Sequence, residues 1–218
     1  MLSYTEENYL KAIYHLSAGG EQEVSTNSIA DSLHTKAASV SDMLKKLSIK
    51  NLVEYRRYKG VNVSEEGKKE ALKIIRKHRL WEVFLVNHLK FKWDEVHDVA
   101  EQLEHIKSPL LIKRLDEFLG FPSFDPHGDP IPDEFGVIKD KAKIMLKDLD
   151  QGCEAVVVAV SDDNPAFLQY CSKLGISIGT PLKALEKLEF DQSMQLLLDG
   201  EIKINVSKEV SENIWVTD

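Results

Sequence analysis

Four side chains that commonly bind metal ions lie close together in the sequence: His97, Glu101, Glu104 and His105. If this segment is helical, with about 3.6 residues per turn, the four positions share one face. Imidazole nitrogens and carboxylate oxygens suit divalent first-row cations, and without a thiolate the preference moves toward harder ions such as Mn²⁺. The pattern therefore indicates a metal site built from nitrogen and oxygen ligands.

A second pair, His78 and Glu82, has a spacing of four residues on an earlier predicted helix. If the two helices pack antiparallel, six ligand-type side chains can converge. Two simpler interpretations stay open. A single His–Glu pair on a helix is usually a surface ion pair worth about 0.2–0.5 kcal/mol, and His78 lies within the basic run of residues 76–79.

These residues do not form a known catalytic motif. The HExxH signature of zinc hydrolases is not met, because no histidine stands four residues before His105. A nucleophile elbow, a P-loop and a dinucleotide fingerprint are also missing from the sequence. We therefore expect a binding protein and not an enzyme.

The elements that precede these residues predict a DNA-binding fold. Apolar residues recur with helical spacing over residues 5–16, and residues 18–20 break the pattern. Capping residues at 25–28 introduce a second helix, and the short link 34–36 leads into a third. Two short helices joined by a tight turn, over residues 25–51, outline a helix-turn-helix.

A basic hairpin follows the third helix. Residues 52–57 have the pattern of a strand, 58–60 that of a turn, and 61–63 that of the returning strand. Together with the helices, this predicts a winged helix-turn-helix. The expected DNA contacts come from the third helix and the wing: Lys36, Ser39, Ser41, Asp42, Lys45, Lys46, Arg56, Arg57 and Lys59.

The charge distribution supports a nucleic-acid partner for this segment. The chain has a net charge of −8, yet residues 34–79 contain 13 lysines and arginines against 5 acids. DNA binding needs a local positive patch and not a basic protein, although a solvated helix face would show the same charges. Lys45 and Lys46 suit phosphate, whereas Asp42 can accept from cytosine or pair with Lys46.

More helices and a loop are expected after the wing. Helical patterns cover residues 65–89 and 93–106, and a shorter amphipathic helix covers 109–119. Residues 121–133 hold four prolines and one glycine and predict a structured loop. An apolar stripe on the shorter helix needs cover and predicts a dimer interface: Leu110, Leu111, Leu115 and Phe118.

From about Leu149 the pattern becomes that of a small β module. Residues 155–160 read as a buried strand, and a helix over 165–174 ends at Gly175, where a C-terminal cap is expected. The expected fold is mainly α with a small β part. Three domains are expected: a winged helix-turn-helix domain at 1–70, a helical metal-binding and dimerisation domain at 71–142, and an SH3-like domain at 149–218.

Cysteine usage and hydropathy restrict the environment. Cys153 and Cys171 form no CxxC pair, which argues against a disulfide framework and a thiolate zinc site. No apolar run approaches the ~20 residues that span a bilayer, and the amino terminus lacks the features of a secretory signal. We expect a cytoplasmic protein without a membrane partner.

Several motifs together resemble the diphtheria toxin repressor family, which includes the manganese transport regulators: TEENYLKAIYHL, RKHRLWE, VHDVAEQLEH and HGDPIPD. The resemblance extends over nearly the whole chain and implies an SH3-like, FeoA-type barrel at its end. It also implies a homodimeric repressor that binds double-stranded operator DNA when loaded with metal and controls metal-uptake genes. Two metal ions per subunit are implied.

The resemblance assigns ligands to both ions. One site is implied to use His78, Glu82 and His97, with an oxygen ligand from the C-terminal module. Asp162 and Asp163 are the candidates for that ligand, although either can instead cap the following helix. The other site is implied to use Glu101, Glu104 and His105 and, from the first helix, Asn8.

Three positions bear on the choice of metal. Iron-responding members have cysteine where this chain has Glu101, and manganese-responding members have glutamate, so hardness favours Mn²⁺, with Fe²⁺ as the alternative. Asn8 stands where other members carry methionine or aspartate, which removes a charge. Lys11 stands where one manganese subgroup has a glutamate ligand, so the closely spaced two-metal arrangement of that subgroup is not expected.

Two other functions stay open on the residues alone. One is a metal-independent winged-helix regulator that reads a small molecule through the C-terminal module. The other is a metal-dependent hydrolase with an accessory DNA domain, although a catalytic metal needs an open coordination position and a positioned general base.

Overall fold

The computed structural model describes residues 2–56, 60–139, 141–161 and 164–217, which form two compact units. The first unit comprises residues 1–78, 102–109 and 132–137, and the second comprises residues 79–101, 110–131 and 138–218. Among the described residues, no helix has both the length and the apolar character that crossing a membrane requires.

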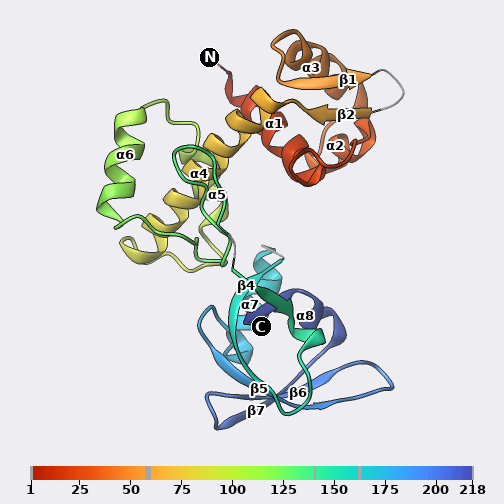
Figure 1. Cartoon of the computed structure of the whole chain (residues 1–218), viewed down its shortest axis with the longest axis vertical. Coiled ribbons are helices and arrows are strands. Elements are labelled where there is room, and N and C mark those ends of the chain that lie inside the picture. The colour runs from red at the N-terminus through yellow and green to blue at the C-terminus, as the bar shows by residue number, and fades with distance from the viewer. Residues whose placement is uncertain (1, 57–59, 140, 162–163, 218) are drawn as a thin grey trace. The chain divides into compact units, whose positions relative to one another are not determined.

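The first unit begins with the predicted winged helix-turn-helix (Figure 1). Its elements are α1 (Tyr4–Leu16), the short turn η1 (Ala18–Gly20), α2 (Thr26–Ser32), α3 (Ala37–Ile49), β1 (Val53–Arg56) and β2 (Gly60–Val63). The two strands pair antiparallel. Ser3 and Glu6 form a capping box at α1, and Ser25 caps α2, as its residue type predicts. Leu10 and Leu44 lie in the shared core, which is fully buried there.

A glycine sets how closely the long helix α4 (Glu65–Asn87) approaches the wing. Gly67 lies in the first turn of α4, and a Cβ there would overlap the carbonyl oxygen of Leu52 and lie 2.9 Å from Cγ2 of Val63. Ser64 fixes the same turn, because its hydroxyl accepts from the Gly67 amide (3.0 Å) and its own amide donates to Leu52 (3.0 Å). Only glycine fits this contact without a shift of the backbone.

The helices α5 (His97–Leu103) and α6 (Pro109–Phe118) follow α4, and α5 is shorter than predicted. Residues 93–96 form turns, because the Lys92 amide donates to the Glu95 carboxylate (3.1 Å) and Trp93 packs against the C-terminal core. Glu104 and His105 lie in the turn after α5. The prediction that they continue one helical face with His97 and Glu101 is therefore wrong.

The proline-rich loop of residues 121–133 contains no helix, and its only strand-like pairing is the isolated bridge between Phe124 and Pro130. The Asp125 carboxylate organises its tip by accepting from the amides of His127 (2.8 Å) and Asp129 (3.0 Å). Gly128 has a φ of +87°, a left-handed conformation that favours glycine.

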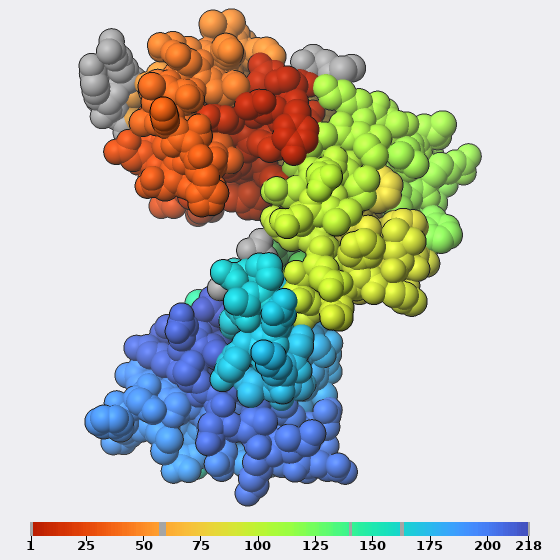
Figure 2. Space-filling view, turned by 180° about the vertical axis from the view of Figure 1, so that it is seen from behind, coloured from red at the N-terminus to blue at the C-terminus, as the bar shows by residue number. Residues whose placement is uncertain are grey.

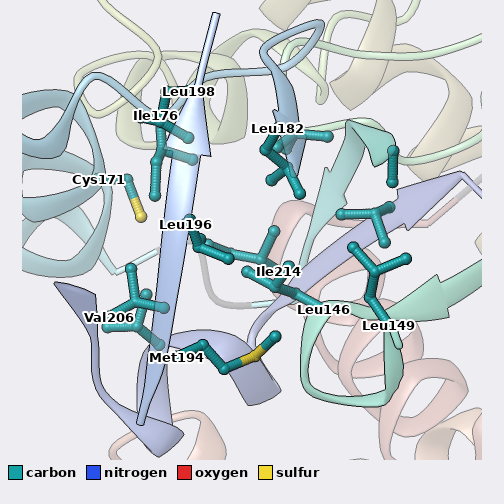
Figure 3. Packing of buried hydrophobic residues seen from close by; sticks show 14 of the residues in the cluster. Leu146, Leu149, Cys171, Ile176, Leu182, Met194, Leu196, Leu198, Val206 and Ile214 are labelled. Carbon is teal, nitrogen blue, oxygen red and sulfur yellow. The ribbon is translucent and has the colours of Figure 1, made fainter. Parts of the chain in front are cut away.

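The rest of the second unit is a module built on one antiparallel sheet, with the strand order β3-β8-β4-β5-β6-β7. The bounds are β3 (Lys143–Met145), η2 (Leu146–Asp148), β4 (Glu154–Val160), α7 (Pro165–Leu174), β5 (Pro181–Lys187), β6 (Met194–Leu198), β7 (Ile202–Val206), α8 (Lys208–Glu212) and β8 (Ile214–Thr217). Figure 2 shows α7, in cyan, on the surface of this module. Leu146, Leu196 and Ile214 meet in its core (Figure 3).

The predicted fold class, mainly α with a small β part, is confirmed. Helix α7 ends as predicted at Gly175, which has a φ of +79°. Strand β3 and helix α8 were not predicted, because each is too short to show a clear periodicity in the sequence.

Candidate metal centre and DNA-binding surface

His105 is held in one orientation by residues of α1. Its ring contacts that of Tyr4 in a tilted arrangement with a centroid distance of 3.8 Å, and its Nδ1 lies 2.6 Å from the Glu7 carboxylate. Because a carboxylate only accepts, Nδ1 carries the proton and the lone pair stays on Nε2. A second residue of α1, Asn8, lies beside Glu7 in the sequence. Glu7 thus selects the tautomer in which Nε2 can bind a cation.

Two ligand atoms here are buried without a partner. His105 Nε2 and Asn8 Oδ1 have no hydrogen-bond partner among the residues that the structure describes. Leaving such groups unsatisfied is costly in a folded protein, so each one calls for a physical explanation. An imidazole nitrogen and an amide oxygen are both donors that a divalent first-row cation accepts. The donor set therefore fits a metal ion.

Glu104 is the charged centre of this cluster. Its carboxylate is fully buried, 2.8 Å from Lys11 Nζ and 2.6 Å from His78 Nδ1, and its Oε1 lies 3.6 Å from His105 Nε2. Burial alone raises the pKa of Glu104, but the hydrogen bond from His78 and the charge of Lys11 offset this, so the pKa lies below its ordinary value. Glu104 is thus a carboxylate anion beside a free imidazole nitrogen.

Glu7 was missed by the sequence reasoning. It belongs to the opening motif and precedes Asn8 directly, and it lies four residues before Lys11, so the helical period places all three near one face of α1. A search for carboxylates on the face that carries Asn8 would have found it.

Replacing Glu7 by glutamine should weaken Mn²⁺ binding by roughly 10–100-fold, the usual effect of losing a group that orients a ligand. The amide can donate as well as accept and so no longer enforces the proton on Nδ1. Isothermal titration with Mn²⁺ measures the effect, and circular dichroism checks the fold. Glu23→Gln, at an exposed glutamate of the same unit, is the matched control. Equal affinities of the two variants would show that Glu7 does not orient His105.

A second set of ligand-type residues lies in the second unit. Glu82, buried on α4, has its Oε1 3.8 Å from His97 Nδ1, and His97 Nε2 lies 3.5 Å from the Glu101 carboxylate. His78 precedes Glu82 by one turn on the same helix. Of the residues predicted from their spacing, Glu101 contacts His97, whereas Glu104 contacts Lys11 and His78.

The proline-rich loop adds two ligand-type residues that were not predicted. Asp125 and His127 are buried, and each has a ligand atom within 4.8 Å of one on Glu82. His127 Nε2 donates to the Trp93 carbonyl (2.8 Å), and its Nδ1 lies 3.7 Å from Glu82 Oε1. The HGDPIPD motif begins at His127, and Asp125 lies two residues before it; their ligand types were the signal for finding them.

The surroundings of Asp125 and His127 raise the pKa values of both side chains. Burial lowers the pKa of His127, but the hydrogen bond with Glu82 and the charges of Glu82 and Asp125 raise that pKa to about 9. Burial and the charge of Glu82 raise the pKa of Asp125, against the opposing charge of Arg79, whose Nε lies 3.4 Å from Asp125 Oδ2. A protonated His127 supports the carboxylate of Glu82, and a cation would have to displace its proton to bind the ring.

Helix α3 exposes most of the predicted DNA contacts. Lys36, Ser39, Asp42, Lys45 and Lys46 are exposed, as is Arg56 in the wing, whereas Ser41 is half-buried and donates to the Ala37 carbonyl (3.0 Å). The Asp42 carboxylate pairs with Lys45 (2.9 Å), which lowers its pKa. Arg57 and Lys59 lie outside the described residues.

The predicted dimer stripe is only partly exposed. Leu110, Leu111 and Phe118 are exposed on α6, but Leu115 is buried within its own chain, with 6% of its surface accessible. The expectation that Leu115 belongs to the exposed stripe is therefore wrong, because α6 needs one apolar side to pack on its own unit.

The predicted ligand from the C-terminal module is not located. Asp162 and Asp163 lie outside the described residues. The N-cap of α7 is Asn164, whose side chain accepts from the Ala166 amide (2.9 Å). Asn164 therefore caps α7, which is the role that Asp162 or Asp163 was predicted to fill if it did not bind metal.

A winged helix-turn-helix followed by helices with buried nitrogen and oxygen ligands defines a class, that of DNA-binding regulators that bind metal. Family models agree with this along the chain. Residues 1–61 match the iron dependent repressor N-terminal DNA binding domain, residues 64–133 match the iron dependent repressor metal binding and dimerisation domain, and residues 144–218 match the FeoA domain.

Relatives and solved structures identify the family. The iron-dependent repressor IdeR of Mycobacterium tuberculosis is 32% identical over 161 residues, 71% of this chain and 70% of the relative. The diphtheria toxin repressor of Corynebacterium diphtheriae is 27% identical over 94% of this chain and 84% of the relative. A manganese-dependent transcriptional repressor in complex with manganese is 35% identical, with a TM-score of 0.86 over 98% of this chain and 99% of that chain. The manganese regulator SloR is 35% identical, with a TM-score of 0.76 over 98% of each chain.

The chain belongs to the diphtheria toxin repressor family of metal-dependent transcriptional repressors. Its DNA-binding and dimerisation domains indicate DNA and a second copy of the chain as partners. Members of the family regulate transcription and are not enzymes.

Proposed function

We propose that Mn²⁺ activates this repressor, with Fe²⁺ as the alternative, and that each subunit holds two metal ions. The observation that carries the proposal is the pair of buried ligand atoms without a partner, Asn8 Oδ1 and His105 Nε2, with the anionic Glu104 beside the latter. The proposed ligands of one ion are His78, Glu82, His97 and either Asp162 or Asp163; those of the other are Asn8, Glu101, Glu104 and His105.

The residues around the second ion prepare it for a cation. Glu7 orients the His105 ring, and Lys11 and His78 keep Glu104 ionised. A bound divalent ion would be coordinated by His105 Nε2 and Asn8 Oδ1, the buried ligand atoms without a hydrogen-bond partner among the described residues. Because a ligand shifts an equilibrium only by its different affinity for the two states, the metal must favour a conformation in which α1 and the turn after α5 both contribute ligands.

In that conformation the repressor binds operator DNA as a homodimer and represses metal-uptake genes in the cytoplasm. We place α3 in the major groove, with Lys45, Lys46 and Arg56 on phosphates and Ser39 near the bases. Leu110, Leu111 and Phe118 supply the dimer contact. The proposed domain bounds are 1–70 for DNA binding, 71–142 for metal binding and dimerisation, and 149–218 for the SH3-like module.

Measuring DNA affinity under different metal conditions tests the proposal. Binding to operator fragments, selected from a random pool in the presence of Mn²⁺, is followed by fluorescence anisotropy with EDTA, Mn²⁺, Fe²⁺ or Zn²⁺. Strong binding with Mn²⁺ and weak binding with EDTA is expected, with a steep loss of affinity as salt rises. Equal affinity in EDTA and Mn²⁺ would favour a metal-independent regulator, and cleavage of the DNA would favour a hydrolase.

Replacing Glu101 by cysteine should shift the metal response toward softer ions. Thiolates favour softer cations than carboxylates do, so we expect the Mn²⁺ response to weaken relative to the responses to Fe²⁺ and Zn²⁺. The same anisotropy titration measures the order of metals. Glu101→Gln, which keeps an oxygen ligand and removes only the charge, is the control. An unchanged order in the cysteine variant would contradict the argument from hardness.

A further inference from the structure

The geometry points to residues 125–129 as a coupling loop: we propose that metal binding at Glu82 and docking of this loop on strand β4 stabilise each other through the positioning residue His127. The metal half of the inference rests on the proposed function, since it takes Glu82 as a ligand. The docking half rests on contacts within the second unit alone.

The side chain of His127 connects the loop to Glu82, the proposed metal ligand. The buried imidazole is fixed by the Trp93 carbonyl, which accepts from Nε2 at 2.8 Å, and Nδ1 faces Glu82 Oε1 at 3.7 Å. Since His97 Nδ1 lies 3.8 Å from the same Glu82 oxygen, His127 sits on a carboxylate that also faces a proposed ligand. Outer groups of this kind orient a ligand and set its basicity.

The backbone of His127 connects the loop to strand β4. The His127 carbonyl accepts from the Val160 amide of β4 at 3.0 Å. Gly128, the next residue, touches the strand so closely that a Cβ would overlap the Val158 carbonyl oxygen and lie 2.5 Å from Cα of Ala159. The loop therefore lies directly against the backbone of β4, and only glycine permits that approach.

The loop between the two ends is stiff. Asp125 accepts from two amides of the loop, and Arg79 on α4 lies 3.4 Å from Asp125 Oδ2 and 3.0 Å from Asp129 Oδ2. Displacing the backbone of Gly128 must therefore displace the imidazole of His127. Because the loop is stiff, a change in its docking on β4 changes the position of the His127 side chain beside Glu82.

Side-chain contacts also join this part of the helices to the β module, among them the hydrogen bond from Gln169 Nε2 to Asp94 Oδ2 (2.9 Å). Trp93 Nε1 donates to the Ser172 hydroxyl (2.9 Å), and beside it lies a cavity of about 260 Å³ lined in part by Val83, Phe124 and Ile178. The contact at Gly128 is the place where a single added carbon would overlap the backbone of β4.

Coupling of two equilibria is reciprocal. If loop docking strengthens metal binding by some factor, then metal binding strengthens docking by the same factor, and couplings of roughly 5–150-fold are typical. The Val160 amide reports docking directly, because its proton is protected by the His127 carbonyl. Its exchange with solvent can be followed by NMR in the full chain, with EDTA or with the diamagnetic ion Zn²⁺ as the metal.

Two substitutions separate the ends of the loop. Gly128→Ala should release the backbone end, and its matched control is Gly152→Ala, because Gly152 has a φ of +86° but open space where the Cβ would lie. Both variants carry the same backbone strain, so their difference isolates the contact with β4. His127→Leu removes the link to Glu82 and keeps the carbonyl that protects Val160.

We expect metal to slow Val160 exchange in the unsubstituted chain. We also expect Gly128→Ala to weaken metal affinity by roughly 5–150-fold relative to Gly152→Ala, and His127→Leu to remove the effect of metal on Val160. Metal binding without any change at Val160, or equal affinities of the two alanine variants, would overturn the coupling alone. Failure of the unsubstituted chain to bind metal would overturn both the coupling and the proposed function.

Discussion

Replacing His105 by alanine should abolish the stimulation of DNA binding by Mn²⁺ while the chain stays folded. The substitution removes Nε2, a buried ligand atom without a hydrogen-bond partner among the described residues. It also leaves the buried Glu7 carboxylate without its hydrogen bond, at a cost of about 1–3 kcal/mol. Because domains of this size are stable by about 5–15 kcal/mol, the fold should persist.

The measurement is anisotropy of operator DNA with EDTA and with Mn²⁺, with circular dichroism as the check on folding. His15→Ala, at an exposed histidine of α1, is the control and should keep its response to metal. Stimulation that survives in His105→Ala would show that the site is wrongly assigned.

Glu104→Ala would be a less clean test of the same site. Glu104 is the partner of Lys11 and His78, and removing one partner of a buried ion pair costs about 3–5 kcal/mol because the other charge stays buried and unpaired. In that variant, weaker DNA binding could result from lost metal binding or from lower stability of the fold, and the measurement would not separate the two.

Replacing Gly67 by alanine should destabilise the winged helix-turn-helix. In most helix interiors alanine is more stable than glycine by about 1 kcal/mol. At Gly67 the new Cβ would overlap the Leu52 carbonyl oxygen and lie 2.8 Å from its carbonyl carbon, so backbone must move. Inserting an atom into such packing costs about 1–3 kcal/mol, which outweighs the gain in helix propensity.

Thermal unfolding measures this effect, and a lower melting temperature with weaker DNA binding is expected. Lys69→Ala, at an exposed position two residues further along α4 where alanine is also favourable, should leave the melting temperature nearly unchanged. A Gly67→Ala variant as stable as the original chain would mean that the contact between α4 and the wing is not tight.

Local patterns predicted most of the elements. Ser25 is a good N-cap, Gly175 a good C-terminal cap, and the apolar spacing of residues 5–16 has a helical period, so each signal depends on a few neighbouring residues. The bounds of α5 were missed because both depend on distant partners. Trp93 bonds Ser172, and Glu104 bonds Lys11, and no local period reveals either contact.

In the candidate site too, local patterns predicted some residues, and those that depend on distant contacts were missed. Ligand types and spacing identified Glu82, His97, Glu104 and His105, because metals select side chains by their chemistry. The supporting groups, Glu7 and His127, were missed, since a residue that orients a ligand acts through a contact between segments 98 and 45 positions apart.

If Glu104 binds the metal as proposed, its ion pair with Lys11 places a competitor for the ion within the chain itself. The ammonium lies 2.8 Å from the carboxylate and neutralises it in the absence of an ion. Because Lys11 is tethered to α1, its local concentration is fixed by the chain and does not follow the composition of the surroundings. On the proposed role of Glu104, the competition that a metal ion meets is therefore set by the protein, and replacing Lys11 by an uncharged residue should change the metal level at which the repressor responds.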